Sequence, residues 1–346
     1  MYDTFYGLHE PPFSLTADPR FLYHSAAHDR AAQAMLGAIR RRDGVAVLTG
    51  DHGVGKTMLC RAIMEQLDRR TLISLVADPF VTPEDLLKRV LVDFGVTSGS
   101  DVAAGRLAKA SRADLQTALR DFLYSLAPLQ AFAVVIIDEA QNLSVDLLKE
   151  VRVLADTGGD ERLLQLMLVG KPSLLATLSK PELRPLLQRV SVRAVLGPLA
   201  GDEMTGYVAH RLQVAGASPR IEFDDLATQR LYAISRGAPR VINLVCDHAL
   251  AEGSAASASR IDEGFIGRAA EALDLAPRAP ATSSLRMVVT ALVFALLVLV
   301  GAAAGAFVFR ANVAAWLERG QARPTAPVQP QPAVPPVVAP GPRSNP

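Results

Sequence analysis

Apolar residues fall into two alternating patterns along the first two hundred residues of the chain. Short, largely apolar runs occupy residues 45–49, 71–76, 133–137, 163–169 and 193–196. Such runs are typical of strands that are buried on both faces of a parallel sheet. Apolar residues at helical spacing lie before the first run, at 26–42, and between later runs, at 58–67, 83–94 and 113–126. Strands that alternate with helices predict an α/β fold of three layers, with a parallel sheet between two layers of helices.

The pattern differs on either side of this α/β core. The first 30 residues carry aromatic side chains separated by prolines, and Pro11-Pro12 opposes a helix, so we expect an extended arm laid across the domain. From residue 201 to residue 273 the apolar spacing is helical throughout. We therefore expect the arm at 1–30, the α/β core at 31–199 and a small all-helical domain at 200–273.

A long apolar segment lies near the C-terminus. Residues 287–309 contain no charged side chain over 23 positions. As a helix they would extend about 35 Å, which exceeds the roughly 30 Å of a bilayer's hydrocarbon core. This predicts one transmembrane helix, in which the spacing of Gly301 and Gly305 would support helix pairing. We expect a linker at 274–286 and a Pro-rich tail at 310–346, disordered or in polyproline II, that acts as a spacer or a partner-binding strip.

Composition excludes several classes of site. The chain of 346 residues has 36 Lys and Arg against 35 Asp and Glu, a net charge of +1, so nucleic acid is not expected as a partner. Cys60 and Cys246 lie in predicted helices without metal-ligand spacing, which indicates buried thiols.

Residues 50–57 form the motif that carries the most chemistry. They read Gly-Asp-His-Gly-Val-Gly-Lys-Thr, which matches G-x-x-x-x-G-K-[ST] between a predicted strand and a predicted helix. Glycines let backbone N–H groups turn toward phosphate oxygens, while Lys56 would reach the β- and γ-phosphates and Thr57 would ligate Mg²⁺. This predicts an ATP site; the structural alternative is a glycine-rich turn before a helix. The candidate binding residues are Gly50, Gly53, Val54, Gly55, Lys56, Thr57 and Met58.

Two acids follow the apolar run at 133–137. Asp138 and Glu139 fall at the carboxyl end of a predicted strand, where open α/β sheets bind ligands. Asp138 is placed to hold Mg²⁺ through water, and Glu139 is the candidate to polarise the attacking water. The alternative is an ordinary helix cap after a strand.

Several segments together resemble the ExeA/GspA-type family of bacterial secretion ATPases. The segments are residues 5–8, 12–16, 18–23, 50–57, 137–143, 168–170, 188–190, 207–212 and 237–243. The resemblance covers about residues 1–272 and implies a P-loop AAA+ fold, ATP hydrolysis and a homo-oligomer. It also implies a role in building type II secretion or type IV pilus machinery in the bacterial envelope.

The same resemblance assigns three further residues. Arg240 is similar to the sensor-2 arginine that reaches the γ-phosphate, with a surface helix-start arginine as the alternative. Arg189 is similar to the arginine finger given to a neighbouring subunit, with Arg184 and Arg193 as rivals. Lys171 stands near sensor 1 where the family usually has Gln, and an ammonium group cannot accept a hydrogen bond from water. We therefore expect either slow turnover or a Lys171 that points away.

The sequence as a whole predicts a membrane-anchored ATPase that drives or gates assembly of an export system: type II secretion, type IV pilus or polysaccharide export. The expected partners are further copies, in a ring or dimer, and inner-membrane components of that system. Lys and Arg counts around the apolar segment do not decide its orientation. Because ATP is cytosolic and no leader precedes the first domain, we expect a cytoplasmic ATPase domain and a periplasmic tail. The family's type II secretion member carries a peptidoglycan-binding domain beyond the membrane, and from the short tail we do not expect direct cell-wall binding here.

Two alternatives stay open. One is a DNA-associated ATPase of the transposition target-selection type, against which the apolar segment and the balanced charge argue. The other is a nucleotide-dependent scaffold with negligible turnover.

Overall fold

The computed structural model describes residues 2–77, 82–100, 110–159, 161–216 and 221–275, together with residues 309, 310 and 313. The chain divides into two compact units, Met1–Pro277 and Arg278–Pro346, and the fold described below belongs to the first. The predicted linker (274–286), transmembrane helix (287–309) and tail (310–346) lie almost entirely outside the described residues. Within the described ranges no helix has both the length and the apolar character needed to cross a membrane.

A parallel sheet forms the centre of the first unit, as predicted. Its five strands run in the order β2-β3-β4-β1-β5. They are β1 (Val45–Gly50), β2 (Thr71–Val76), β3 (Phe132–Ile137), β4 (Leu164–Gly170) and β5 (Val190–Leu196). Because every pair is parallel, the carboxyl ends of β1, β3 and β4 meet at one edge of the sheet.

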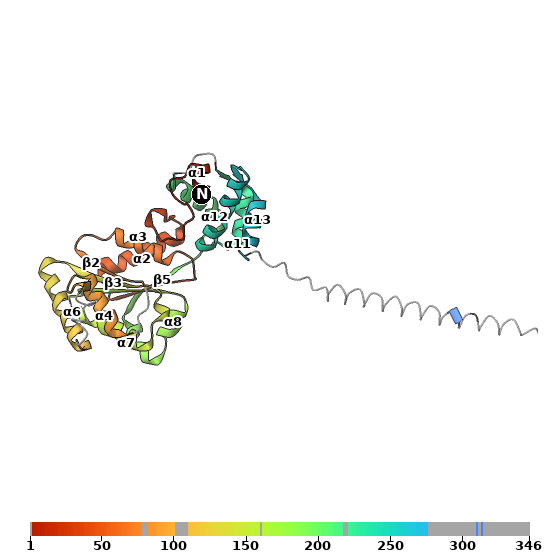
Figure 1. The fold of residues 1–346 in the computed structure, drawn as a ribbon. Coiled ribbons are helices and arrows are strands. Elements are labelled where there is room, and N and C mark those ends of the chain that lie inside the picture. Colours follow the sequence, from red (N-terminus) through yellow and green to blue (C-terminus); the bar gives the residue numbers. More distant parts are fainter. Residues whose placement is uncertain are drawn as a thin grey trace, which may run out of the picture. The chain divides into compact units, whose positions relative to one another are not determined.

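Helices cover both faces of this sheet (Figure 1). One layer consists of α2 (Ala26–Arg41) and α3 (Lys56–Glu65). The other consists of α4 (Pro83–Asp93), α6 (Arg112–Leu126), α7 (Val145–Thr157), α8 (Ser173–Leu178) and α9 (Arg184–Arg189). Alternate residues of β1 feed the two layers: Val45 and Val47 join the core under α4, α6 and α7, while Ala46 and Leu48 join the core under α2 and α3.

Two sequence-based boundaries need correction. The strand predicted at 193–196 begins earlier, at Val190. It is an edge strand whose alternate residues Ser191, Arg193 and Val195 are exposed, so its first half carries no apolar run. The helix predicted at 58–67 spans Lys56–Glu65 instead, because the phosphate-loop motif supplies its first turn.

The residues after β5 form a helical region. It contains α10 (Met204–Val214), α11 (Asp225–Ser235), α12 (Pro239–Ala255) and α13 (Glu263–Ala272). The prediction of helices alone was wrong in one detail, since the short strands β6 (Glu222–Phe223) and β7 (Arg260–Ile261) pair in parallel. Two residues are too few to show a strand period in the sequence.

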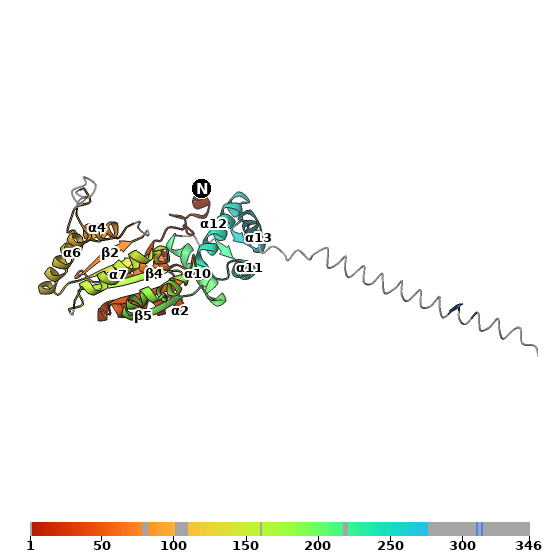
Figure 2. The same cartoon turned by 90° about the horizontal axis from the view of Figure 1, so that it is seen from below.

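The N-terminal arm packs into this helical region. Its first residues form the short helix α1 (Tyr2–Tyr6), where extended chain was expected, and α1 lies beside α12 in both views (Figures 1 and 2). Tyr6, Leu8, Phe13 and Phe21 share a core with side chains of the four helices. The Tyr6 hydroxyl also donates to the carbonyl oxygen of Ala258, at 2.9 Å. Segments near the two ends of the first unit therefore form one core.

A buried histidine links α2 to the loop after β1. Ser25 caps α2, and its hydroxyl lies 2.7 Å from Nδ1 of His28. The other ring nitrogen, Nε2, lies 3.1 Å from the carbonyl oxygen of Val54. The side chain is buried, and this burial lowers the pKa of His28 below its ordinary value of 6.5. The folded protein therefore favours the neutral form of the His28 ring over the protonated form.

We expect this histidine to make the fold sensitive to acid. Below pH 6.5 the unfolded chain binds a proton at His28 before the folded chain does, so the free energy of unfolding falls as the pH drops. Urea unfolding at pH 7.5 and 5.5 should show a larger loss for the wild type than for His28→Gln. His248→Gln, which changes a half-buried histidine of α12, should lose as much as the wild type. Equal losses in all three proteins would contradict the assignment.

Gly237 is a second position on which the fold depends. Its φ is +76°, and a Cβ there would lie 2.0 Å from the carbonyl oxygen of Leu199, whose N–H donates to the Gly237 oxygen at 2.9 Å. Gly95 offers a matched control: its φ is +75°, and in the described part of the chain no heavy atom lies within 4 Å of the Cβ position.

We therefore expect Gly237→Ala to destabilise the fold more than Gly95→Ala. The control should lose about 1–2 kcal/mol from left-handed backbone strain alone, and Gly237→Ala should lose roughly 1–3 kcal/mol more from overpacking. Urea unfolding followed by circular dichroism measures both values. Similar losses of stability in the two variants would show that the backbone around Leu199 can shift to accommodate the added methyl group without destabilising the fold.

Candidate nucleotide-binding site

The candidate site lies at the sheet edge where β1, β3 and β4 end. The loop after β1 takes left-handed backbone at two glycines, Gly53 (φ 80°) and Gly55 (φ 100°). A Cβ on Gly53 would lie 2.7 Å from Cβ of Arg240, so this position also needs glycine for space. Among the described residues no side chain caps α3, which leaves its first N–H groups available to an anion.

Lys56 begins α3 and folds back over the loop. Its Nζ donates to the carbonyl oxygens of Gly50 and Asp51, both at 2.9 Å, and the side chain is 6% exposed. Burial lowers the pKa of Lys56, while the nearby carboxylates of Glu139 and Asp138 act in the opposite direction. The ammonium group is thus held at the loop by backbone carbonyls rather than by a direct ion pair.

Thr57 and Asp138 meet across the site. The Thr57 hydroxyl donates to Oδ2 of Asp138 at 2.5 Å, and the Asp138 side chain is 3% exposed. Its second oxygen, Oδ1, accepts from the backbone N–H of Glu139 at 2.8 Å. Hydroxyl and carboxylate oxygens are the ligands that Mg²⁺ prefers, usually completed by phosphate oxygens and water. In the described ranges no group of three or more His, Cys, Asp or Glu residues could hold a metal without such help.

Glu139 is held in an unusual backbone conformation. Its φ is +50°, a left-handed value that costs a non-glycine residue about 1–3 kcal/mol. Its carboxylate accepts from Nε2 of Gln141 at 2.6 Å, and Oε1 of Gln141 accepts from the backbone N–H of Lys171 at 2.8 Å. A Cβ on Gly170 would lie 2.6 Å from that same Oε1, so the chain approaches closely there. Gln141 therefore connects the end of β4 to Glu139.

Lys171 lies beside this chain of hydrogen bonds. Its backbone takes part through Gln141, and its side chain is exposed. The Lys171 charge is near enough to Lys56 to contribute to the lowered pKa of Lys56.

Arg240 brings the helical region onto the loop. It is the second residue of α12, and its backbone N–H donates to the carbonyl oxygen of Gly53 at 3.0 Å. Its side chain is exposed and lines the cavity above the loop.

The structure does not bring Arg189 to the site of its own chain. Arg189 ends α9, directly before Val190, which pairs with Val45 at the amino end of β1. That is the edge of the sheet opposite to the phosphate loop. The guanidinium is 59% exposed and forms an ion pair with Asp156 at 2.7 Å. Its rivals Arg184 and Arg193 are exposed as well.

Several parts of the chain line a cavity above the loop. The loop, the first turn of α3 and the residues after β3 contribute His52, Gly53, Gly55, Lys56, Thr57, Met58 and Glu139. The arm contributes Ser14, Leu15, Thr16, Ala17, Phe21, Leu22 and Tyr23, and the helical region contributes Leu199, Tyr207, Pro239, Arg240 and Asn243. His28 completes the lining. Sequence reasoning missed the arm residues, His28, Tyr207 and Asn243 as cavity walls, because only the tertiary fold brings them to the loop.

Comparison with known proteins agrees with this architecture. A family model described as an AAA domain matches residues 39–178. General secretion pathway protein A of Aeromonas hydrophila is 38% identical over 271 residues, which cover 78% of this chain and 48% of that protein. The chain thus spans about half the length of this relative.

Solved structures share the fold at low sequence identity. ORC2 of Aeropyrum pernix matches with a TM-score of 0.58 and 16% identity over 80% of this chain and 74% of that one. CDC6P of Pyrobaculum aerophilum matches with a TM-score of 0.57 and 16% identity over 75% of this chain and 70% of that one. These likenesses show the α/β P-loop AAA fold alone. The secretion-protein relative and the family model confirm the resemblance carried by the sequence motifs: over 271 residues the chain is similar to General secretion pathway protein A, and residues 39–178 match an AAA domain.

Proposed function

We propose that the chain binds ATP with Mg²⁺ above the loop after β1 and hydrolyses it. The observation that carries this proposal is the contact of Thr57 with Asp138 at 2.5 Å, directly beside a glycine cradle that Lys56 spans. The residues fit the ligand: the cradle leaves no room for a Cβ at Gly53, and the donor set consists of hard oxygens.

Each residue has a definite task in this proposal. Backbone N–H groups of the loop and Lys56 bind the phosphate oxygens, and Thr57 and Asp138 hold the cation. When bound, Mg²⁺ offsets negative charge on the phosphate oxygens. Glu139 accepts a hydrogen bond from the attacking water and polarises it, while the Gln141 amide fixes the direction of its carboxylate. The arrangement is a general-base site beside an anion cradle.

The helical region serves as the lid of the site. Arg240 is the residue through which it acts, because its backbone is bonded to Gly53 and its side chain lines the cavity. The guanidinium would add positive charge at the phosphate end, as a sensor-2 arginine does.

A homo-oligomer completes the proposed site. The exposed Arg189 is available to a neighbouring copy once it leaves Asp156, and we propose it as the arginine finger given in trans. Lys171 would then tune turnover through the Gln141–Glu139 contact.

We propose that this ATPase is anchored in the inner membrane by residues 287–309, with its ATPase domain in the cytoplasm. The uncharged 23-residue segment in the sequence supports the anchor, and the similarity to General secretion pathway protein A supports a role in a secretion pathway. The proposed task is to drive or gate assembly of an envelope export system, of the type II secretion, type IV pilus or polysaccharide class.

Lys56→Ala should weaken nucleotide binding. Loss of charge-assisted hydrogen bonds of about 1.5–3 kcal/mol corresponds to roughly tenfold to a hundredfold. Isothermal titration with a non-hydrolysable ATP analogue and Mg²⁺ measures the effect. Lys149→Ala, which removes an exposed lysine of α7 paired with Asp146, is the matched control and should bind as the wild type does. Unchanged affinity in Lys56→Ala would remove the site assignment.

Glu139→Gln should separate binding from hydrolysis. The amide keeps an oxygen that can accept from Gln141 but is a poor base, so phosphate release should fall by about 10²–10⁴-fold while nucleotide affinity is retained. Steady-state phosphate release and titration of the same preparation test both halves. If wild type and variant release phosphate at the same near-zero rate, the chain is a nucleotide-dependent scaffold instead.

A further inference from the structure

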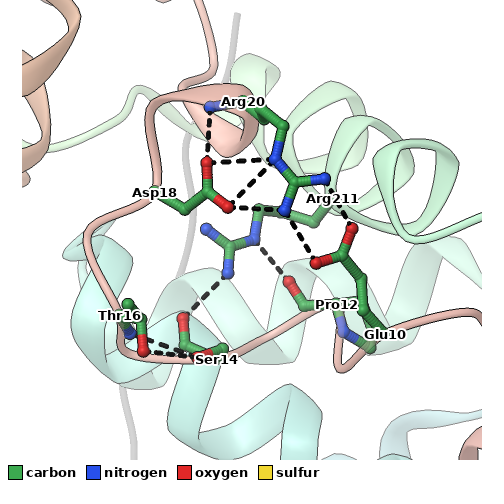
Figure 3. A network of polar contacts seen from close by, with 7 residues as sticks. All are labelled: Glu10, Pro12, Ser14, Thr16, Asp18, Arg20 and Arg211. Atoms are coloured by element: carbon green, nitrogen blue, oxygen red, sulfur yellow. Dashed lines mark hydrogen bonds and ion pairs between the residues drawn. The ribbon is translucent and has the colours of Figure 1, made fainter.

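One arginine of the helical region is entirely buried. Arg211 on α10 has an exposed fraction of 0%. Its Nε donates to the carbonyl oxygen of Pro12 at 2.6 Å and its Nη2 to that of Ser14 at 2.9 Å. The guanidinium lies over the ring of Phe21, 4.5 Å from the centroid. Figure 3 shows it reaching beneath the arm, between these two carbonyl groups.

This burial is costly, and the cost has to be explained. The donors of Arg211 face backbone carbonyls rather than a carboxylate, and Nη1 finds no hydrogen-bond partner among the described residues. Burial lowers the pKa of Arg211 accordingly. An apolar side chain would fill the same space without the penalty of desolvating a charge. Unlike an apolar residue, Arg211 can donate hydrogen bonds to two carbonyl groups of the arm.

The carbonyl groups of Pro12 and Ser14 lie at the start of the arm segment that lines the cavity. Ser14 to Ala17 line it, and Phe21 to Tyr23 line it further along the arm. Asn243 supports the same point from α12, with Nδ2 3.5 Å from the Ser14 oxygen. Asn243 is itself fixed by the Tyr207 hydroxyl at 2.7 Å. The inner side of the arm is therefore attached to the helical region through buried polar contacts.

The outer side of the arm is closed by exposed ion pairs. Arg20 donates to Glu10 at 2.9 Å and to Asp18 at 2.6 Å, so the segment from 10 to 20 forms a closed loop (Figure 3). Such exposed pairs contribute little to stability. The position of the arm thus depends mainly on the contacts of its inner side, and there Arg211 makes two hydrogen bonds, at 2.6 and 2.9 Å. Arg61 of α3 adds one to the Ala17 carbonyl at 2.7 Å.

The arm forms the apolar part of the cavity. Leu15, Ala17 and Phe21 of the arm lie with Met58 and Tyr207 in its lining, whereas Lys56 and Glu139 mark its polar end. A flat heterocyclic base buries its faces against apolar side chains, while phosphates need N–H groups and cations. The two ends of the cavity therefore suit the two ends of a nucleoside triphosphate.

We propose that Arg211 is a positioning residue for the base of the bound nucleotide, acting through the arm. It holds the Pro12 and Ser14 carbonyls so that the following residues stand as the apolar wall against which the base packs. The inference rests on the proposed ATP site and assigns Arg211 no contact with the ligand.

The test uses the full chain and compares the Michaelis constant with the turnover number. In Arg211→Met the KM for ATP should rise at least tenfold while kcat stays within about threefold, because Lys56, Thr57 and Glu139 are untouched. Partial misfolding would instead lower kcat and leave KM unchanged. Arg211→Lys should be intermediate, because one ammonium group cannot match the planar fork of a guanidinium. Arg20→Gln, on the outer side of the same arm, is the matched control and should keep both constants.

Inorganic tripolyphosphate, used as a competitive inhibitor, shows whether Arg211 affects binding of the base or binding of the phosphates, because it has phosphates but no base. Its inhibition constant should be equal in wild type and Arg211→Met, while Lys56→Ala should weaken both ligands. An unchanged KM in Arg211→Met, or an inhibition constant that rises in parallel with KM, would overturn the inference. If Arg211→Met does not fold, the KM of Arg211→Lys decides in the same way. A wild type that binds neither ATP nor tripolyphosphate would instead refute the proposed function.

Discussion

The hydrogen bond between Thr57 and Asp138 is the contact on which the rest of the site depends. It joins the first turn of α3 to the end of β3, across β4, which lies between β1 and β3 in the sheet. The backbone N–H of Asp138 also donates to the carbonyl oxygen of Val76 at 2.8 Å, so β2 helps to position Asp138 as well. Because parallel register fixes where each strand ends, a slip of one residue in any of these pairs would separate the hydroxyl from the carboxylate.

How far the sequence predicts this structure depends on where each residue is buried. The central strands lie between two layers of helices and therefore appear as largely apolar runs; β2 was predicted to the residue. The edge strand β5 alternates and was half missed. At the site, the phosphate loop and the two acids are recognisable from sequence motifs. The contacts of Gln141 with Glu139 and of His28 with Val54 are not, because only the tertiary fold brings these residues together.

The helical region and the arm share one hydrophobic core, although about 180 residues of chain separate them. Phe13, Phe21, Tyr207 and Leu250 all belong to this core, and Arg211 donates to the backbone carbonyls on either side of Phe13. Such pairing of distant segments carries a large loop-closure cost before its contacts form. The core of this region is therefore complete only after both ends of the unit have folded.

This shared core also sets how the two halves of the unit are connected. The chain passes between them twice, once before α2 and once after β5, and the two crossings lie together because Glu203 accepts from the backbone N–H of Ala26 at 3.0 Å. Two adjacent connecting segments restrict rotation of one half relative to the other far more than a single linker does. A swing of the helical half about these crossings would move Arg240 and the Ser14 end of the arm together, because both are attached to that half.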